Sequence, residues 1–231
     1  MKIHGLNKTT LLDYPGHLAA TLFLGSCNFR CVFCQNTALV LDPASQPVIS
    51  EEEIFSFIQK RKGVLQGICI TGGEPTLDPD LIPFITRLKN TGLKIKLDTN
   101  GYRPEILKEL LEQDLLDMVA MDIKSAPSDY PRITGLSSID FKKIEESIHI
   151  LMNSSIDYEF RTTVVNEYFH PNSFEEIGLL LKGATAYYLQ CFQDSDTVLE
   201  RGLTSPTKEA LLSYQQIMLP FVPNTQLRGI D

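Results

Sequence analysis

The sequence predicts an α/β fold: a partial (β/α)6 barrel of the TIM type, formed by a single domain. Short apolar segments of strand length alternate along the chain with longer segments whose apolar residues recur at helical spacing. Strands that alternate with helices of this length form parallel βαβ units with right-handed crossovers. Six such units and one short final strand are too few to close an eight-stranded barrel, so we expect an open one.

The expected strands are apolar runs that end at glycine or polar residues. They span residues 18–24, 67–71, 93–97, 118–123, 158–165 and 186–192, with a short last strand at 225–228. The first strand runs directly into a cysteine-rich loop, the second ends at Gly72 and the third ends at Asp98. Polar and reactive residues therefore follow the carboxyl ends of successive strands.

The expected helices lie between these strands. They span residues 80–89, 104–111, 140–152, 174–181 and 207–219, and another helix begins after Ser50. Ser50 is the expected N-cap of that helix, because three glutamates follow it and favour a helix start. We expect Ser173 to cap the 174–181 helix, with Glu176 completing a capping box.

Composition indicates one globular domain over residues 1–231, with a core at about 16–193 and a C-terminal helix and short strand within 206–229. The hydrophobic content of 43% is ordinary for a globular protein, and no Gly-, Ser- or Pro-rich linker divides the chain. The net charge of -8 argues against nonspecific nucleic-acid binding. No apolar run is long enough for a signal peptide or membrane span, so we expect a cytoplasmic protein without a membrane partner.

Three of the five cysteines lie within eight residues, at Cys27, Cys31 and Cys34. Cysteine thiolates hold iron-sulfur clusters, normally four for a cubane. A C-x3-C-x2-C triad without a fourth partner would leave one iron open to a non-protein ligand. We expect Cys69, inside an apolar strand, to behave as a small hydrophobe rather than a ligand. We expect the same of Cys191, on which the sequence is less informative.

Zinc and disulfides are the alternatives for the triad. A structural zinc site needs a second cysteine pair or a nearby histidine, and the four histidines are scattered along the chain. Three close cysteines cannot pair evenly into disulfides, and a chain of this length does not need them. An iron-sulfur cluster is the interpretation that we favour.

Several motifs accompany the triad in a set order. They are Asp13-Tyr14-Pro15-Gly16, Asn36, Thr71-Gly72-Gly73-Glu74-Pro75, Leu97-Asp98-Thr99-Asn100-Gly101 and Met121-Asp122-Ile123-Lys124. With the cysteines, this set resembles the radical S-adenosylmethionine (SAM) superfamily, and the later motifs are similar to those of glycyl-radical-enzyme activases. The resemblance covers roughly the first half of the chain. It implies a partial barrel with a [4Fe-4S] cluster on Cys27, Cys31 and Cys34.

The resemblance also implies the chemistry. The amine and carboxylate of SAM chelate the unique iron, one electron cleaves the sulfonium, and the resulting 5′-deoxyadenosyl radical abstracts hydrogen. For an activase, that hydrogen comes from the Cα of one glycine in a partner enzyme. A flavodoxin- or ferredoxin-type protein is the implied electron donor. Since the cofactors carry the difficult chemistry, the protein positions and shields them.

The resemblance assigns roles to residues at the strand ends. Those expected to bind SAM are Phe33, Gly72, Gly73, Glu74, Asp98, Asn100, Lys124 and Arg161. Glu74 would accept the SAM ammonium, Lys124 would pair with its carboxylate, and Phe33 would pack on adenine. Phe29 is expected to anchor the cysteine loop in the barrel instead.

A monovalent cation could bind at the same strand ends. The resemblance implies Asp98 and Asp122 as its ligands, with further oxygens from Thr99 and Ala120. Each of these motifs also has an ordinary interpretation: a tight turn for Gly-Gly-Glu-Pro, helix caps for the aspartates, and a surface position for Lys124.

The end of the sixth strand bears on the partner. Pyruvate formate-lyase activases carry a histidine there, whereas this chain has Gln190 followed by Cys191. That version is more similar to the activating proteins of anaerobic ribonucleoside-triphosphate reductase. The expected partner is therefore a glycyl radical enzyme, and specifically anaerobic ribonucleotide reductase.

Two other functions remain open at this point. A radical SAM enzyme that acts on a small molecule, such as a 7-carboxy-7-deazaguanine synthase, would use the same SAM-binding residues. A noncatalytic iron-sulfur or zinc-binding module would keep the cysteines but leave the strand-end motifs without a purpose.

Overall fold

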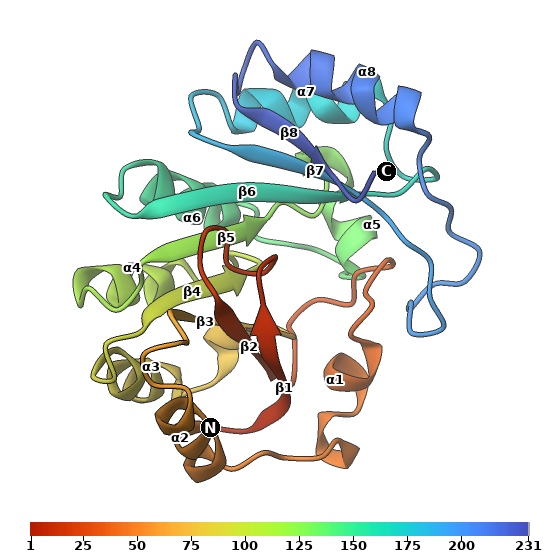
Figure 1. Cartoon of the computed structure of the whole chain (residues 1–231). Helices are drawn as coiled ribbons and strands as arrows, with labels where there is room; N and C mark the ends of the chain where they lie inside the picture. The colour runs from red at the N-terminus through yellow and green to blue at the C-terminus, as the bar shows by residue number, and fades with distance from the viewer. Residues whose placement is uncertain (231) are drawn as a thin grey trace.

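One curled sheet organises the molecule, with its strands hydrogen-bonded in chain order from β1 to β8 (Figure 1). The computed structural model describes residues 1–230. The strands are β1 Ile3–Thr10, β2 Ala19–Leu24, β3 Gly67–Gly72, β4 Lys94–Thr99, β5 Met118–Asp122, β6 Asp157–Val164, β7 Tyr187–Cys191 and β8 Thr225–Arg228. From β2 to β8 every pairing is parallel. These seven strands confirm the predicted set.

Helices fill the connections between the parallel strands and cover the outer side of the sheet (Figure 1). The longer ones are α2 Glu51–Lys60, α3 Leu81–Lys89, α4 Pro104–Glu112, α6 Lys142–Met152, α7 Pro171–Leu180 and α8 Lys208–Met218. Shorter turns are α1 Thr37–Leu41, α5 Tyr130–Thr134, η1 Pro43–Ser45, η2 Pro75–Leu77 and η3 Pro127–Asp129. Within residues 1–230, no helix combines the length and apolarity needed to cross a bilayer.

The barrel is incomplete, as the strand count predicted. Among the described residues, β1 and β8 each pair with one strand, and not with each other. The antiparallel strand β1 was missed by the sequence analysis. Its eight residues are mostly polar or partly exposed, with Ile3 and Thr10 buried at its ends, so it lacks the apolar run of the other strands.

The start of α7 corrects another prediction. Ser50 caps α2 as expected, in a capping box with Glu53. Helix α7, however, begins at Pro171, whose fixed φ suits a first helical position. Ser173 lies inside this helix, where its hydroxyl accepts the His170 N–H at 3.4 Å. Glu176 bonds instead to Ser128, 48 residues away, so the predicted Ser173–Glu176 capping box is wrong.

The Asp13-Tyr14-Pro15-Gly16 segment closes the amino-terminal end of the barrel. It lies in the loop that connects Thr10, at the end of β1, to its partner Ala19, at the start of β2. The Tyr14 side chain is buried and lies against Gly67, the first residue of β3. Asp13 accepts the Thr21 hydroxyl at 2.5 Å. This motif therefore lies at the opposite end of the strands from the cysteine loop.

Candidate active site

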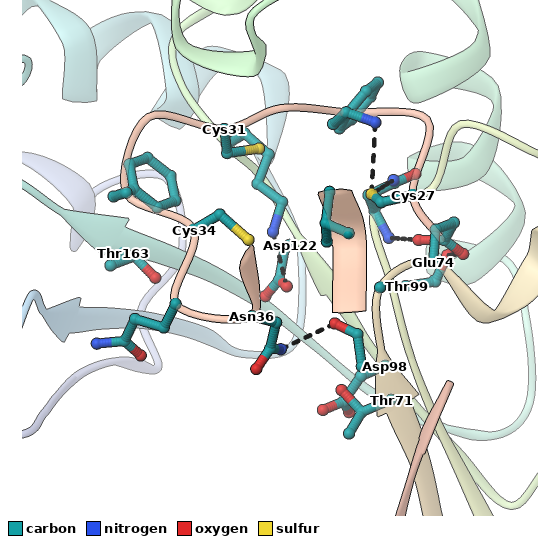
Figure 2. Close-up of a pocket in the computed structure, with 18 residues that line it drawn as sticks. Cys27, Cys31, Cys34, Asn36, Thr71, Glu74, Asp98, Thr99, Asp122 and Thr163 are labelled. Carbon is teal, nitrogen blue, oxygen red and sulfur yellow. Dashed lines mark hydrogen bonds and ion pairs between the residues drawn. The ribbon is translucent and has the colours of Figure 1, made fainter. Parts of the chain in front are cut away.

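The carboxyl ends of β2 to β6 surround a cavity of about 220 Å³, as expected for the motif positions in a parallel barrel (Figure 2). Eleven of the twelve predicted site residues line it: Cys27, Cys31, Phe33, Cys34, Gly72, Gly73, Glu74, Asp98, Asn100, Asp122 and Lys124. The twelfth, Arg161, reaches the cavity through Asp98 and Asp122, as described below. Segments nearly 100 residues apart thus form one site.

The cysteine loop is held by aromatic packing and by the backbone of α5. Phe29 is buried, and its ring lies 5.4 Å from that of Tyr102 and 6.4 Å from that of Tyr130. The Arg30 N–H donates to the Thr134 carbonyl at 2.8 Å. The Arg30 carbonyl lies so close to Gly135 that a Cβ there would approach it to 2.6 Å. The loop is anchored through Phe29, as the sequence predicted.

The three thiols of the loop surround the same space (Figure 2). Burial raises the pKa of Cys27 to about 11 and that of Cys31 to about 12. Thiolates form at such sites when a bound metal supplies the positive charge. No fourth cysteine and no histidine lines the cavity in the described part of the chain, so it offers three thiols and lacks the four sulfur or nitrogen ligands of a typical structural zinc site. This donor set fits a cluster with one open iron.

Gly72, the last residue of β3, and Gly73 after it allow the chain's own backbone to approach closely. A Cβ on Gly72 would lie 2.3 Å from the Leu24 carbonyl oxygen, and one on Gly73 would lie 1.8 Å from the Ser26 carbonyl oxygen. Gly72 also has a φ of +117°, which disfavours other residues. The Asn36 amide donates to the Gly72 carbonyl at 2.9 Å. The glycines thus join the GGEP turn to the cysteine loop, in addition to lining the cavity.

Glu74 is fully buried and braces the ends of β3 and β4. Its carboxylate accepts the Thr76 backbone N–H at 3.1 Å and the Asn100 backbone N–H at 2.7 Å. The Thr76 and Thr99 hydroxyls also donate to it. Burial raises the pKa of Glu74, and these donors partly offset that rise. Both oxygens are therefore already hydrogen-bonded within the protein.

Asp98 and Asp122 are linked by Arg161, which lies beside Asp122 in the β5–β6 register. The Arg161 Nε donates to Asp122 Oδ1 at 2.9 Å, and its Nη1 donates to Asp98 Oδ2 at 3.3 Å. Lys124 donates to Asp122 Oδ2 at 3.0 Å. Although burial acts to raise the pKa of both carboxyls, the Arg161 guanidinium beside them holds each pKa below its usual range.

Lys96 completes this network and was missed by the sequence analysis. It is 1% exposed, and its ammonium is paired with Asp98 Oδ1. The signal was present, because residues two apart on a strand share a face. Lys96 and Asp98 are two apart, at the end of the strand predicted over residues 93–97.

Comparison with known proteins identifies the family. The model of the Radical SAM superfamily matches residues 21–181. The chain belongs to this superfamily. A Methanocaldococcus jannaschii protein named for glycyl-radical enzyme activation is 30% identical over 99% of this chain and 96% of its own length. A 7-carboxy-7-deazaguanine synthase from Koribacter versatilis is 30% identical over 64% of this chain and 62% of its own length.

Solved structures share the fold. A domain of the pyruvate-formate lyase-activating enzyme from Bacteroides vulgatus has a TM-score of 0.57 at 17% identity, covering 71% of this chain and 99% of its own. Streptococcus suis SuiB bound to S-adenosylmethionine has a TM-score of 0.67 at 11% identity, covering 90% of this chain and 52% of its own. As a member of the radical SAM superfamily, the protein uses a [4Fe-4S] cluster and SAM as cofactors.

Proposed function

We propose that the protein is a glycyl-radical-enzyme activating enzyme: it removes a hydrogen atom from the Cα of one glycine in a partner protein. The observation that carries this proposal is the end-to-end relationship with the M. jannaschii protein named for that activity. The activase-like motifs Asp98-Thr99-Asn100-Gly101 and Asp122-Ile123-Lys124 support it, because residues of both line the same cavity as the cysteine loop. The synthase relative, by comparison, matches 64% of the chain.

The residues divide the work around the cofactors. Cys27, Cys31 and Cys34 would hold the cluster, which with SAM supplies the radical chemistry. Lys124, beside the cavity, would pair with the SAM carboxylate by exchanging its contact with Asp122. Phe33, buried against the same cavity, would pack on adenine. Glu74 would act on the SAM amine chiefly by fixing Asn100 and the neighbouring turn, since its own oxygens are hydrogen-bonded.

A second hollow offers a route for the partner's glycine loop. It has a volume of about 230 Å³, lies at the ends of β6 to β8, and shares Gln35 and Thr163 with the main cavity. Gln190 and Cys191 line it as well. Because β8 pairs only with β7 and its other edge is free, an extended peptide could enter beside it.

We further propose that the partner is anaerobic ribonucleotide reductase, since Gln190 stands at the end of β7 where the pyruvate formate-lyase activases have histidine. A flavodoxin- or ferredoxin-type protein would deliver the electron. The free thiols of the cysteine loop require a reducing compartment, which favours the cytoplasm.

Deuterium transfer tests the proposal. A peptide copied from the radical loop of the reductase, carrying deuterium at the glycine Cα, is incubated without oxygen with the cluster-loaded protein, SAM and a reductant. We expect deuterium in the 5′-deoxyadenosine, and none with an alanine-substituted peptide. Release of 5′-deoxyadenosine whose label comes only from a free small molecule, such as a pterin, would support the synthase-like alternative instead.

A further inference from the structure

Every carboxylate oxygen of Asp98 and Asp122 is already paired with a cationic nitrogen. Asp98 Oδ1 bonds to the Lys96 ammonium and Asp98 Oδ2 bonds to the Arg161 guanidinium. The same guanidinium is ion-paired with Asp122 Oδ1, and the Lys124 ammonium is ion-paired with Asp122 Oδ2. No oxygen of the two aspartates lacks such a partner.

This arrangement does not fit the monovalent cation that the sequence resemblance implied. Three cationic side chains face two carboxylates, so the group carries one positive charge in excess. A further carboxylate, Glu159, lies 4.0 Å from the Arg161 guanidinium but is itself held by Arg228 through two hydrogen bonds of 2.8 Å, so including this pair leaves the excess unchanged. An added potassium or sodium ion would compete with these donors, and Lys96 and Arg161 would still hold both Asp98 oxygens when Lys124 turns from Asp122 to SAM.

Lys96 is the member of the group that no motif includes. Its side chain is 1% exposed, within the barrel, where its ammonium also lies 3.9 Å from the Cys69 sulfur. Burying an ammonium this deeply has a high desolvation cost, which a paired carboxylate offsets. Its partner, Asp98, lies two residues later on the same face of β4 and lines the cavity. The charge of Lys96 therefore acts directly on Asp98, a residue of the site.

We propose that Lys96 is a built-in cation: its ammonium stabilises and orients Asp98, so that SAM binds without an added monovalent cation. Lys96 is a positioning residue, since it acts on the cavity through Asp98. The proposal rests on the placement of SAM in this cavity, but it is independent of the identity of the glycyl partner.

Three variants separate charge from volume. Lys96→Ala removes the ammonium and leaves space that a small cation could enter, whereas Lys96→Met removes the charge and fills the space. Lys94→Ala, on the same strand but exposed, is the matched control. For the cluster-loaded protein, the affinity for SAM is measured by calorimetry, and the midpoint of thermal unfolding, Tm, is measured without SAM. Both are recorded at equal ionic strength in potassium, methylammonium and tetramethylammonium chloride.

We expect the wild type and Lys94→Ala to bind SAM equally well in all three salts, within about twofold. Lys96→Ala should bind about tenfold more weakly in tetramethylammonium and recover most of that loss in potassium or methylammonium. Lys96→Met should show the loss without the recovery. Its Tm should also be independent of the salt, while that of Lys96→Ala rises with the small cations.

Two results would overturn the proposal. One is a wild type whose SAM affinity or Tm depends on potassium, which would mean that an external cation is required. The other is a folded Lys96→Met that binds SAM as tightly as the wild type. The Tm comparison needs no SAM, so it remains decisive even if SAM binds elsewhere. Failure of deuterium transfer from a glycyl peptide would leave all of these measurements unchanged.

Discussion

The Thr99 hydroxyl donates to Glu74 at 2.7 Å, and this hydrogen bond joins the last residue of β4 to the turn that follows β3. The Asn100 N–H donates to the other carboxylate oxygen, and the Asn100 amide in turn lies 3.8 Å from the Cys27 sulfur. A buried carboxylate therefore links three of the four motifs at the cavity. Its environment leads to the first prediction.

Glu74→Gln should lower both stability and SAM affinity. The Thr76 and Asn100 backbone N–H groups point at different oxygens, so either orientation of a glutamine places its NH2 against one of them. An unsatisfied buried donor costs about 1–3 kcal/mol. Denaturant unfolding and calorimetry with SAM measure the two effects. Glu52→Gln, exposed in α2, is the control, and equal behaviour of the two variants would argue against the bracing role of Glu74.

Cys31→Ala should lose the cluster and with it SAM cleavage, whereas Cys69→Ala should keep about four irons per chain. Cys31 faces the cavity, but Cys69 is a buried residue of β3 that does not line it. Both changes remove a buried thiol and leave a methyl side chain, so their effects on packing are similar. Iron and sulfide analysis after anaerobic reconstitution checks the pair. Loss of iron from a folded Cys69→Ala variant would contradict the ligand assignment.

Asp122→Asn should reduce the loss of unfolding free energy that the protein shows as the pH is lowered into the acid range. The pKa of Asp122 is lower in the folded protein than its ordinary value of 3.8, owing mainly to Arg161. Its ionised form thus stabilises the fold at pH values above 3.8, and this contribution is lost as the pH falls below that value.

Unfolding free energies measured by denaturant titration from neutral to acid pH test the effect of Asp122. The wild type should lose stability more steeply than Asp122→Asn in the acid range. The variant should be less stable near pH 7, where Arg161 and Lys124 lose a partner. Parallel profiles for the two proteins would mean that the Asp122 ion pairs contribute nothing to the pH dependence.

Gly73→Ala should disturb the cysteine loop without altering backbone preference at its own position. A Cβ there would lie 1.8 Å from the Ser26 carbonyl oxygen, a backbone atom that cannot move independently. We expect a lower Tm and a reduced cluster content after reconstitution. Gly63→Ala is the comparison, because its φ is +83° and its surroundings are open, so only the conformational cost of about 1 kcal/mol applies. A Gly73 variant that is milder than Gly63→Ala would refute the close approach.

Local sequence predicted the parallel strands well. The runs that became β3 and β5 have continuous apolar, buried centres, which is typical of strands covered on both faces. From that topology alone, the motif-bearing loops had to meet at one edge of the sheet, and they do. Strand β1 and the start of α7 at Pro171 escaped prediction, because one lacks an apolar run and the other depends on a proline and on a distant partner for Glu176.

The sequence by itself determined the alternation of parallel strands and helices, the edge at which the motif residues meet and the three closely spaced thiols, because these follow from local patterns and from the edge at which parallel strands end. Only the tertiary structure decided the pairing of charges inside the barrel. Lys96 and Asp98 lie two apart on β4, but Arg161 reaches Asp98 and Asp122 only when β4, β5 and β6 come into register. Electrostatic partners depend on distances across strands, and local sequence carries no measure of those distances.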